Sequence, residues 1–306
     1  MKDVRRSELQ YTPREESRNL LATCLATRHR PPSKEIITST SSTFLAVDGD
    51  GYELNMGRWS RQLALPFLDF VGTGGKERVL DVGCGTGHLA SAVASASGAV
   101  EVHGVDLSPV YIEHARRHST DPRLVFHVGD ACALDFPDGS FDRVLSLLAL
   151  HFVPRTAQAI AEMRRVAKPG SVVGAAVWDV RGGCVANRIF FDTAAALDPK
   201  AGERRARNYT RPMTRPGEMV TAWRAAGFHD VTETVLCIRM EFTSFADYWA
   251  PYIGRDGPGA EYVGALDQAE RARLEEAVQS AYLDGEADGP RSYAALAWAV
   301  KGTVPS

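Results

Sequence analysis

The segment RVLDVGCGTGHLA, at residues 78–90, constrains the fold of this chain more than any other part of the sequence. It is an apolar run that meets three glycines within five positions and then continues with helix-forming residues. A strand that passes through a tight glycine turn into a helix N-terminus presents backbone N–H groups to a ligand. We therefore expect Gly83, Gly85 and Gly87 to let the chain turn, and to let a ligand approach without meeting a Cβ atom.

The alternation of apolar runs and helical patterns continues downstream of this segment. Ser108 and Pro109 are typical of an N-cap and a first helical position. Regular alternation of strands and helices predicts right-handed crossovers and an α/β fold with a doubly wound, mostly parallel sheet. We expect seven strands, at 78–82, 99–107, 123–130, 141–150, 171–178, 230–240 and 293–302. Helices are expected at 88–97, 108–118, 156–170, 187–197 and 217–228.

The regions outside this pattern define the expected domain organisation. Residues 1–48 have little apolar periodicity and are predicted to form a mostly disordered extension. Residues 49–306 are then one domain, with its core at 76–180 and helical, aromatic cover elements at 181–217 and 243–288. Its first helix has one apolar face, and Pro66 is expected to kink or divide it.

Composition and charge exclude several classes of protein. The 306 residues are 44% hydrophobic with a net charge of −3, which fits one sizeable core without the charge pattern of a nucleic-acid or membrane-binding protein. Five scattered cysteines without a Cys-x-x-Cys favour a reducing cytoplasm over disulfides or a zinc site. His114 and His118 have the spacing of a metal pair, but no carboxylate cluster is near, so we expect an exposed face and no metal.

Asp106 indicates what the glycine loop binds. It lies 25 residues after Asp81, at the end of the second expected strand, where a carboxylate can accept hydrogen bonds from both hydroxyls of a ribose. The loop and Asp106 together predict an adenosine-type nucleotide. A dinucleotide fingerprint fits less well, because the third glycine comes one place early and His88 takes the position of a small residue. A triphosphate loop is disfavoured because no Lys follows.

Four blocks in order resemble the class I S-adenosylmethionine-dependent methyltransferases. They are VLDVGCGTGHLA, VHGVDLSP, HVGDACALDFPDGSFDRVLSLLALHFV and AIAEMRRVAKPGSVVGAAVWD. The resemblance covers residues 52–179 and is strongest to the quinone-biosynthesis and small-molecule branch, the type 11 methyltransferase domain. It implies a Rossmann-like methyltransferase fold, S-adenosylmethionine as the cofactor and a small-molecule acceptor. The cofactor-binding residues that we expect from it, with two lid residues listed first, are Tyr52, Arg58, Asp81, Gly83, Cys84, Gly85, Thr86, Gly87, Asp106, Leu107, Asp130, Ala131 and Leu147.

The acceptor side is less defined by the sequence. His151 follows the fourth strand, and its near-neutral pKa would suit a general base, although a structural histidine is an equal reading. Trp178 and Asp179 end the fifth strand and are candidate walls. Five aromatic residues either cover the acceptor or form the core of their own regions: Phe190, Phe191, Tyr248, Trp249 and Tyr252.

Two other functions remain open at this point, a nicotinamide-dependent oxidoreductase and a non-catalytic protein that binds the cofactor. The acceptor, the methylated atom and the oligomeric state are not indicated by the sequence.

Overall fold

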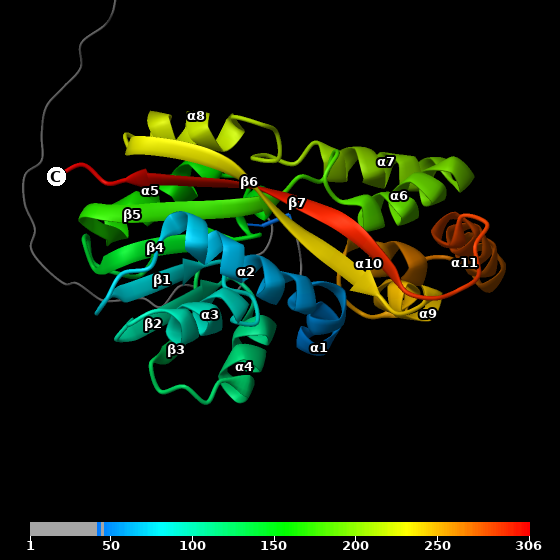
Figure 1. Ribbon diagram of the computed structural model, residues 1–306, viewed down its shortest axis with the longest axis horizontal. Coiled ribbons are helices and arrows are strands. Elements are labelled where there is room, and N and C mark those ends of the chain that lie inside the picture. The colour runs from blue at the N-terminus through cyan, green and yellow to red at the C-terminus, as the bar shows by residue number, and fades with distance from the viewer. Residues whose placement is uncertain (1–41, 44–45) are drawn as a thin grey trace, which may run out of the picture. The chain divides into compact units, whose positions relative to one another are not determined.

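The computed structural model describes residues 42–43 and 46–306. The chain divides into two units, 1–36 and 37–306, and all described residues belong to the second. Most of the predicted extension at 1–48 therefore lies outside the described residues. The second unit is built on a seven-stranded sheet with the order β3-β2-β1-β4-β5-β7-β6, as Figure 1 shows. This is the predicted fold class.

Five parallel strands form the larger part of the sheet. They are β1 (Arg78–Val82), β2 (Glu101–Asp106), β3 (Leu124–Val128), β4 (Phe141–Leu147) and β5 (Ala167–Trp178). β1 matches its predicted bounds, and the other four overlap theirs. The chain runs from β1 outward to β3 and then returns to the other side of β1 with β4. This reversal between β1 and β4 creates the crevice where open α/β sheets bind ligands.

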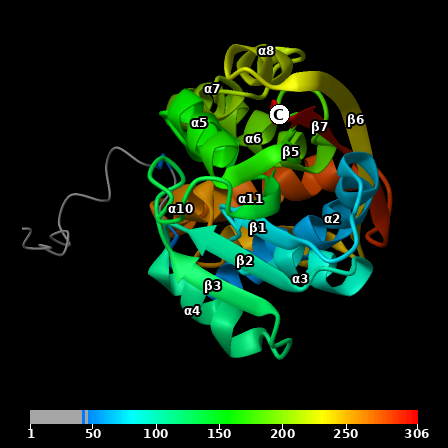
Figure 2. The ribbon, with the colours of Figure 1, turned by 90° about the vertical axis from the view of Figure 1, so that its left-hand side faces the viewer.

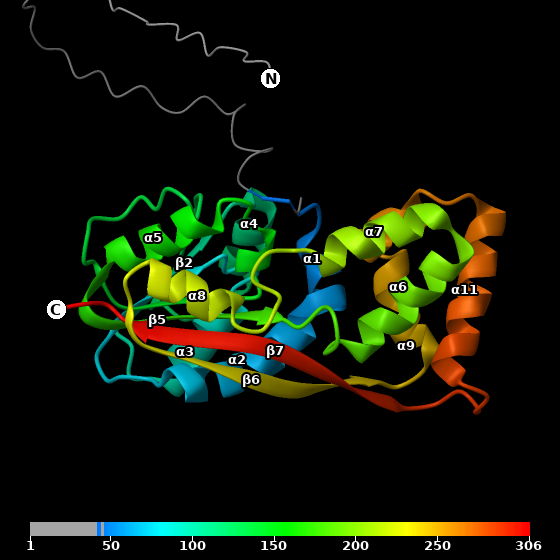
Figure 3. The ribbon, with the colours of Figure 1, turned by 90° about the horizontal axis from the view of Figure 1, so that it is seen from above.

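The last two strands are antiparallel to their neighbours. β6 (His229–Phe242) lies at the edge of the sheet, and β7 (Arg291–Thr303) is paired between β5 and β6. The last β5–β7 pair joins Trp178 and Ala297, whereas β6 and β7 stay paired as far as Phe242 and Arg291. The antiparallel pair of β6 and β7 therefore extends beyond the parallel strands, and Figure 3 shows several helices beside this extension.

Helices cover both faces of the sheet, as seen along it in Figure 2. One face carries α2 (Arg58–Val71), α3 (His88–Ala96) and α4 (Pro109–His118), and the other carries α5 (Thr156–Val166) and α8 (Glu218–Ala225). α4 begins as predicted, because the Ser108 side chain accepts from the Tyr111 N–H and Pro109 is the first helical residue. Each face has its own cluster of buried residues, as a doubly wound sheet requires.

The segment before β1 differs from its prediction. It consists of α1 (Gly49–Tyr52), a π-helical segment at Glu53–Gly57, and α2. Pro66 lies inside α2, which continues to Val71, so of the two expected effects Pro66 does not divide this helix. The irregular backbone lies upstream of Pro66, in the π-helical segment at 53–57. In proteins generally, single π-helical turns of this kind often occur at functional sites.

A second group of helices, which we call the helical layer, packs on the extended part of the β6–β7 strand pair. It contains α6 (Val185–Leu197), α7 (Pro199–Tyr209), α9 (Phe245–Trp249), a 3-10 turn at Ala250–Ile253, α10 (Pro258–Gly264) and α11 (Gln268–Leu283). The sequence placed helical cover in both regions but did not separate α7 or α10.

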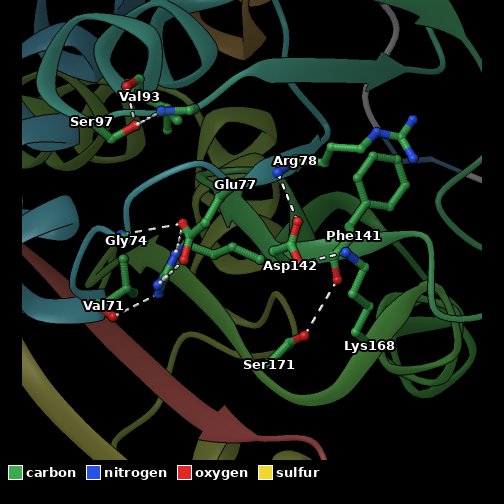
Figure 4. A network of polar contacts seen from close by, with 12 residues as sticks. Val71, Gly74, Glu77, Arg78, Val93, Ser97, Phe141, Asp142, Lys168 and Ser171 are labelled. Carbon is green, nitrogen blue, oxygen red and sulfur yellow. Dashed lines mark hydrogen bonds and ion pairs between the residues drawn. The ribbon is translucent and has the colours of Figure 1, made fainter.

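Polar contacts tie the strands together at the amino-terminal edge of the sheet, in Figure 4. Asp142 accepts from the Arg78 backbone N–H at 2.9 Å and from Lys168 Nζ at 2.5 Å, which joins β1, β4 and β5. Arg143 pairs with Glu77 at 2.9 Å and also donates to the Val71 carbonyl. These contacts hold together the edge opposite the carboxyl ends of the parallel strands.

Candidate functional site

A cavity of about 300 Å³ lies at the carboxyl ends of the parallel strands. The end of every parallel strand contributes to its wall: Gly83 after β1, Asp106 of β2, Gly129 after β3, Leu147 of β4 and Trp178 of β5. The remaining walls come from the segment at 46–56, the α6 and α7 region, and residues 251–260. Elements distant in sequence thus converge on the crevice between β1 and β4.

The three glycines of the loop have different tasks. All have positive φ, at +75° for Gly83, +53° for Gly85 and +92° for Gly87. A Cβ atom on Gly83 would lie 2.2 Å from the Ala149 Cβ, and one on Gly87 would lie 2.8 Å from the Phe126 ring. A Cβ on Gly85 would meet nothing nearer than the Tyr52 hydroxyl at 3.6 Å. Gly85 therefore leaves space open on the cavity side, whereas Gly83 and Gly87 allow close packing within the protein.

Asp106 fixes the glycine loop while it faces the cavity. Its Oδ2 accepts from the Gly85 N–H and its Oδ1 accepts from the Ser108 N–H, both at 2.9 Å. Burial raises the pKa of this carboxyl group. A carboxylate has about four acceptor positions, so further donors can bind to both oxygens.

Asp81 is a second buried carboxyl group next to the loop. It is 1% exposed, its Oδ2 accepts from the Ala90 N–H at 3.1 Å, and its Oδ1 has no hydrogen-bond partner. Burial, with the charge of Asp106, raises its pKa to about 8. Asp81 is not part of the cavity wall, so its effect on a ligand is electrostatic.

Five further predicted cofactor residues line the cavity: Tyr52, Leu107, Asp130, Ala131 and Leu147. The Asp130 carboxylate also accepts from the Cys132 N–H at 2.8 Å and pairs with Arg155 at 3.3 Å. Asp130 therefore caps a local turn and also lines the cavity.

Four other predicted cofactor residues do not line the cavity: Gly87, described above, and Cys84, Arg58 and Thr86. Cys84 is buried, and its Sγ contacts the Gly85 carbonyl at 3.7 Å. Arg58 pairs with Asp247 at 3.0 Å and lies over the Trp59 ring, so its guanidinium group is held by protein contacts. Thr86 donates to Glu53 in the π-helical segment.

Glu53 was not identified from the sequence, although it connects the π-helical segment to the loop. It accepts from Thr86 Oγ1 at 2.6 Å and lies 2.8 Å from His88 Nε2. These hydrogen bonds lower the pKa of Glu53, although its partial burial opposes them. Nothing local in the sequence distinguishes Glu53 from other surface glutamates.

The 251–260 wall is also tied to α4 by a contact that sequence reasoning missed. The Tyr111 hydroxyl donates to Asp256 Oδ2 at 2.6 Å, and Asp256 Oδ1 accepts from the Val47 N–H at 3.0 Å. Asp256 is 2% exposed, and its burial raises its pKa. This contact joins residues 145 positions apart, so no local pattern predicts it.

Leu148 adds local strain to the cavity wall. Its φ is +61°, in the left-handed region that non-glycine residues rarely adopt, and its N–H donates to the Ala176 carbonyl at 2.7 Å. Strained backbone of this kind is common at binding sites, where the surrounding structure holds it in place.

His151 also lines the cavity, and its protonation state differs from the expected one. It is 3% exposed and its Nδ1 has no hydrogen-bond partner. Burial and the charge of Arg211 lower its pKa well below the usual value, rather than leaving it near neutral. The imidazole is therefore uncharged at neutral pH and is a weak base.

Of the two candidate wall residues at the end of β5, only Trp178 lines the cavity. Trp178 lines the cavity, and its Nε1 donates to the Met56 sulfur at 3.4 Å. Asp179 accepts from the N–H groups of Arg181 and Gly182 and is not part of the wall.

The aromatic residues of the cover regions divide between the two expected roles. Phe191 and Tyr252 line the cavity. Phe190, Tyr248 and Trp249 are buried in the helical layer, where Phe190 stacks on Tyr252 with ring centroids 3.9 Å apart. The helical layer thus supports one wall of the cavity from behind.

Only one member of the expected exposed histidine pair is exposed. His114 is buried, at 6% exposed, whereas His118 is exposed as expected, and the two rings stack with centroids 4.0 Å apart. In the described part of the chain, no group of three or more His, Cys, Asp or Glu side chains could hold a metal ion.

None of the helices in the described residues is long and apolar enough to cross a bilayer.

The central part of the chain matches a known family. Residues 79–170 fit a family model described as a methyltransferase domain. This segment runs from β1 into β5 and contains the glycine loop, Asp106 and Asp130.

Two curated relatives illustrate the range of similar proteins. The 27-O-demethylrifamycin SV methyltransferase of Amycolatopsis mediterranei is 39% identical over 98 residues, which are 31% of this chain and 36% of that protein. The 2-methyl-6-phytyl-1,4-hydroquinone methyltransferase of Synechocystis is 41% identical over 104 residues, 34% of this chain and 32% of that protein. The matches span about a third of the length of these relatives.

A solved structure supports the fold across a larger part of the chain. Phosphoethanolamine N-methyltransferase 2 of Haemonchus contortus, in complex with phosphomonomethylethanolamine and S-adenosylhomocysteine, has a TM-score of 0.54 at 19% identity. The alignment covers 84% of this chain and 57% of that one. At this identity the comparison establishes a shared fold.

Proposed function

We propose that this chain, whose residues 79–170 form a class I methyltransferase domain, binds S-adenosylmethionine in its cavity and methylates a small molecule. One observation carries the proposal. Gly85 and Asp106, joined by a 2.9 Å hydrogen bond, both face one cavity at the carboxyl edge of the sheet. An open backbone beside a carboxylate suits the sugar of a nucleoside.

The cavity wall fits the parts of this cofactor. Asp106 has acceptor positions left for the ribose hydroxyls, since each oxygen accepts only one backbone N–H. Leu107, Asp130 and Ala131 follow along the same wall and would hold the adenine. Gly83, Gly85 and Tyr52 would lie along the methionine part.

The charges at this end also fit. Asp81 and Asp106 are neighbouring carboxyl groups, and the charge of Asp106 raises the pKa of Asp81. A ligand with a positive charge relieves this repulsion and favours the ionised form of both groups. S-adenosylmethionine has an ammonium and a sulfonium group, whereas the nicotinamide dinucleotides carry a pyrophosphate, which the Asp106 carboxylate would repel.

Bound S-adenosylmethionine supplies a methyl group that is already activated by the sulfonium. The protein then has mainly to orient the acceptor and exclude water, and a base is needed only if the acceptor must lose a proton. Trp178, Phe191 and Tyr252 give the acceptor end an apolar wall. Because His151 is a weak base in its buried position, we assign it to orienting the acceptor.

The relatives support a small-molecule acceptor, since their names specify a rifamycin and a hydroquinone. An oxygen or carbon atom of a quinone-like or secondary metabolite is the class we propose. The buried, unpaired thiols of Cys84, Cys132 and Cys184 fit a reducing cytoplasm as the place of reaction.

Calorimetry with S-adenosylmethionine and with NAD tests the cofactor assignment. We expect binding of S-adenosylmethionine alone. Asp106→Ala should weaken it about 5- to 150-fold, since hydrogen bonds to a charged group contribute about 1–3 kcal/mol. Unchanged affinity in a folded Asp106→Ala variant, or preference for NAD, would refute the assignment. Transfer of a labelled methyl group to a metabolite extract separates an enzyme from a protein that only binds the cofactor.

A further inference from the structure

The cavity contains a cationic side chain that the proposed function has not used. Arg211 follows α7, lines the cavity and is half-buried. Its guanidinium group lies over the Phe152 ring, with Cζ 4.2 Å from the centroid, and the His151 ring packs against the same Phe152 at 4.1 Å. Arg211 and His151 therefore lie near one another on the cavity wall.

Within the described residues Arg211 has no carboxylate partner, unlike three arginines of α6 and α7. In α6 and α7, Arg188 and Arg205 both pair with Asp192, and Arg204 pairs with Glu261. Across residues 46–306, no carboxylate lies within ion-pair distance of Arg211. Burial lowers its pKa to about 10, which leaves the group charged at neutral pH.

Two of the three asparagines that line the cavity come from α6 and α7, the helices that precede Arg211 in the chain. Asn187 of α6 and Asn208 of α7 line the cavity, and each is half-buried. Neither side chain is engaged in a hydrogen bond with other residues of the described ranges. A cation and two amides whose donors are free, all in the wall of one partly desolvated cavity, are a costly arrangement unless a ligand pairs with them.

We infer that the methyl acceptor carries an anionic group, a carboxylate or a phosphate, which Arg211 binds with Asn187 and Asn208. Arg presents a planar fork of donors that matches both groups, and each Asn adds an N–H donor. The apolar side chains of Trp178, Phe191 and Tyr252 then enclose the remainder of the acceptor. The inference deepens the proposed function and rests on it.

The cavity wall thus contains groups of opposite charge. Asp106 lines the part that we assign to the cationic cofactor, and Arg211 would line the part that we assign to the acceptor. Opposed charges in one cavity orient each ligand before the methyl and the accepting atom meet. His151, kept neutral by its burial and by the charge of Arg211, adds no positive charge of its own.

The test begins with a metabolite extract separated on an anion-exchange resin. The flow-through contains neutral and cationic metabolites, and the eluate contains the anions. With labelled S-adenosylmethionine, the wild-type protein should label an acceptor from the eluate, and phosphatase treatment of that fraction tells a phosphate from a carboxylate. Labelling confined to the flow-through would overturn the inference. Labelling of neither fraction would overturn the proposed function itself, and the inference with it.

The second part measures Arg211→Gln and Arg211→Lys with the labelled eluate as acceptor. Arg211→Gln should raise the acceptor KM about tenfold or more, since charge-assisted hydrogen bonds are lost. Arg211→Lys should restore part of the affinity, and the affinity for S-adenosylhomocysteine should stay unchanged in both. Arg215→Gln is the matched control, because Arg215 pairs with Glu218 outside the cavity. An acceptor KM that is equal in Arg211→Gln and in the control would refute the role of Arg211.

Discussion

At the scale of single residues, Gly85 and its two neighbours show that a glycine motif combines separate requirements. Gly83 and Gly87 are needed because Ala149 and Phe126 occupy the space of their absent side chains. Gly85 is needed because the space beside it is open to the cavity. The same residue type therefore serves packing at two positions and ligand access at the third.

Gly85→Ala tests this division. The side chain meets no protein atom closer than 3.6 Å, so only its left-handed φ should cost stability, about 1–2 kcal/mol. Gly217→Ala is the matched control, with φ of +76° and no atom within 4 Å of the new Cβ. We expect similar losses in urea unfolding, but weaker binding of S-adenosylhomocysteine only for Gly85→Ala. Equal affinity of both variants would mean that the ligand does not approach Gly85.

Asp81 allows a prediction about pH. Its folded pKa is about 8, above the usual carboxyl value, so the native state keeps a proton that the unfolded chain releases between about pH 4 and pH 8. The native state therefore loses stability relative to the unfolded chain as pH rises through this window. Asp81→Asn has no such proton to lose.

Urea unfolding of the ligand-free protein at pH 5 to 9 measures the difference. The stability of Asp81→Asn relative to the wild type should increase up to about pH 8 and then level off. Glu276→Gln, on the exposed side of α11, should follow the wild type at each pH. A constant difference between Asp81→Asn and the wild type would show that Asp81 is ionised throughout.

At the scale of elements, the π-helical segment 53–57 is hydrogen-bonded to the glycine loop and to the helix that follows it. Glu53 holds both Thr86 and His88, and the preceding Tyr52 lines the cavity. The segment therefore positions a cavity wall through contacts with a loop that follows a different element. Since it is short and irregular, we expect its order to depend on these few contacts.

Glu53→Ala should remove the hydrogen bonds that join the π-helical segment to Thr86 and His88. Amide hydrogen exchange at 50–58 should become faster, and the affinity for S-adenosylhomocysteine should fall because the Tyr52 wall is less ordered. Leu54→Ala alters the neighbouring, exposed residue and should change neither quantity. Exchange rates equal to wild type in Glu53→Ala would show that backbone contacts alone hold the segment.

The elements that the sequence predicted best are those with local signals. Ser108 and Pro109 fix the start of α4, and the glycines after Val82 fix the end of β1. The cavity walls formed by Asp256 and Arg211 were not predicted, because their positions depend on contacts with chain segments far away in sequence. The positive φ of Leu148 is likewise set by the fold around it.

At the scale of the whole unit, one buried cluster links the sheet to the helical layer that covers the cavity. It includes Leu63 of α2, Ala297 of β7 and, from the helical layer, Phe190, Tyr248 and Tyr282. Because the paired strands β6 and β7 extend beyond the end of β5, this cluster extends beyond it as well. A shared core of this kind favours one cooperative unfolding transition over the independent loss of a lid.

Phe190→Ala tests whether the helical layer and the sheet unfold as one. Phe190 is 0% exposed and stacks on Tyr252, so its truncation should cost about 3–5 kcal/mol. Leu197→Ala, at the partly exposed end of the same helix, should cost much less. In urea, circular dichroism and amide exchange of β1 and α11 should shift together to a lower midpoint. Loss of α11 protection while β1 keeps its own would show that the helical layer folds separately. The acceptor end of the cavity would then open independently of the end that holds the cofactor.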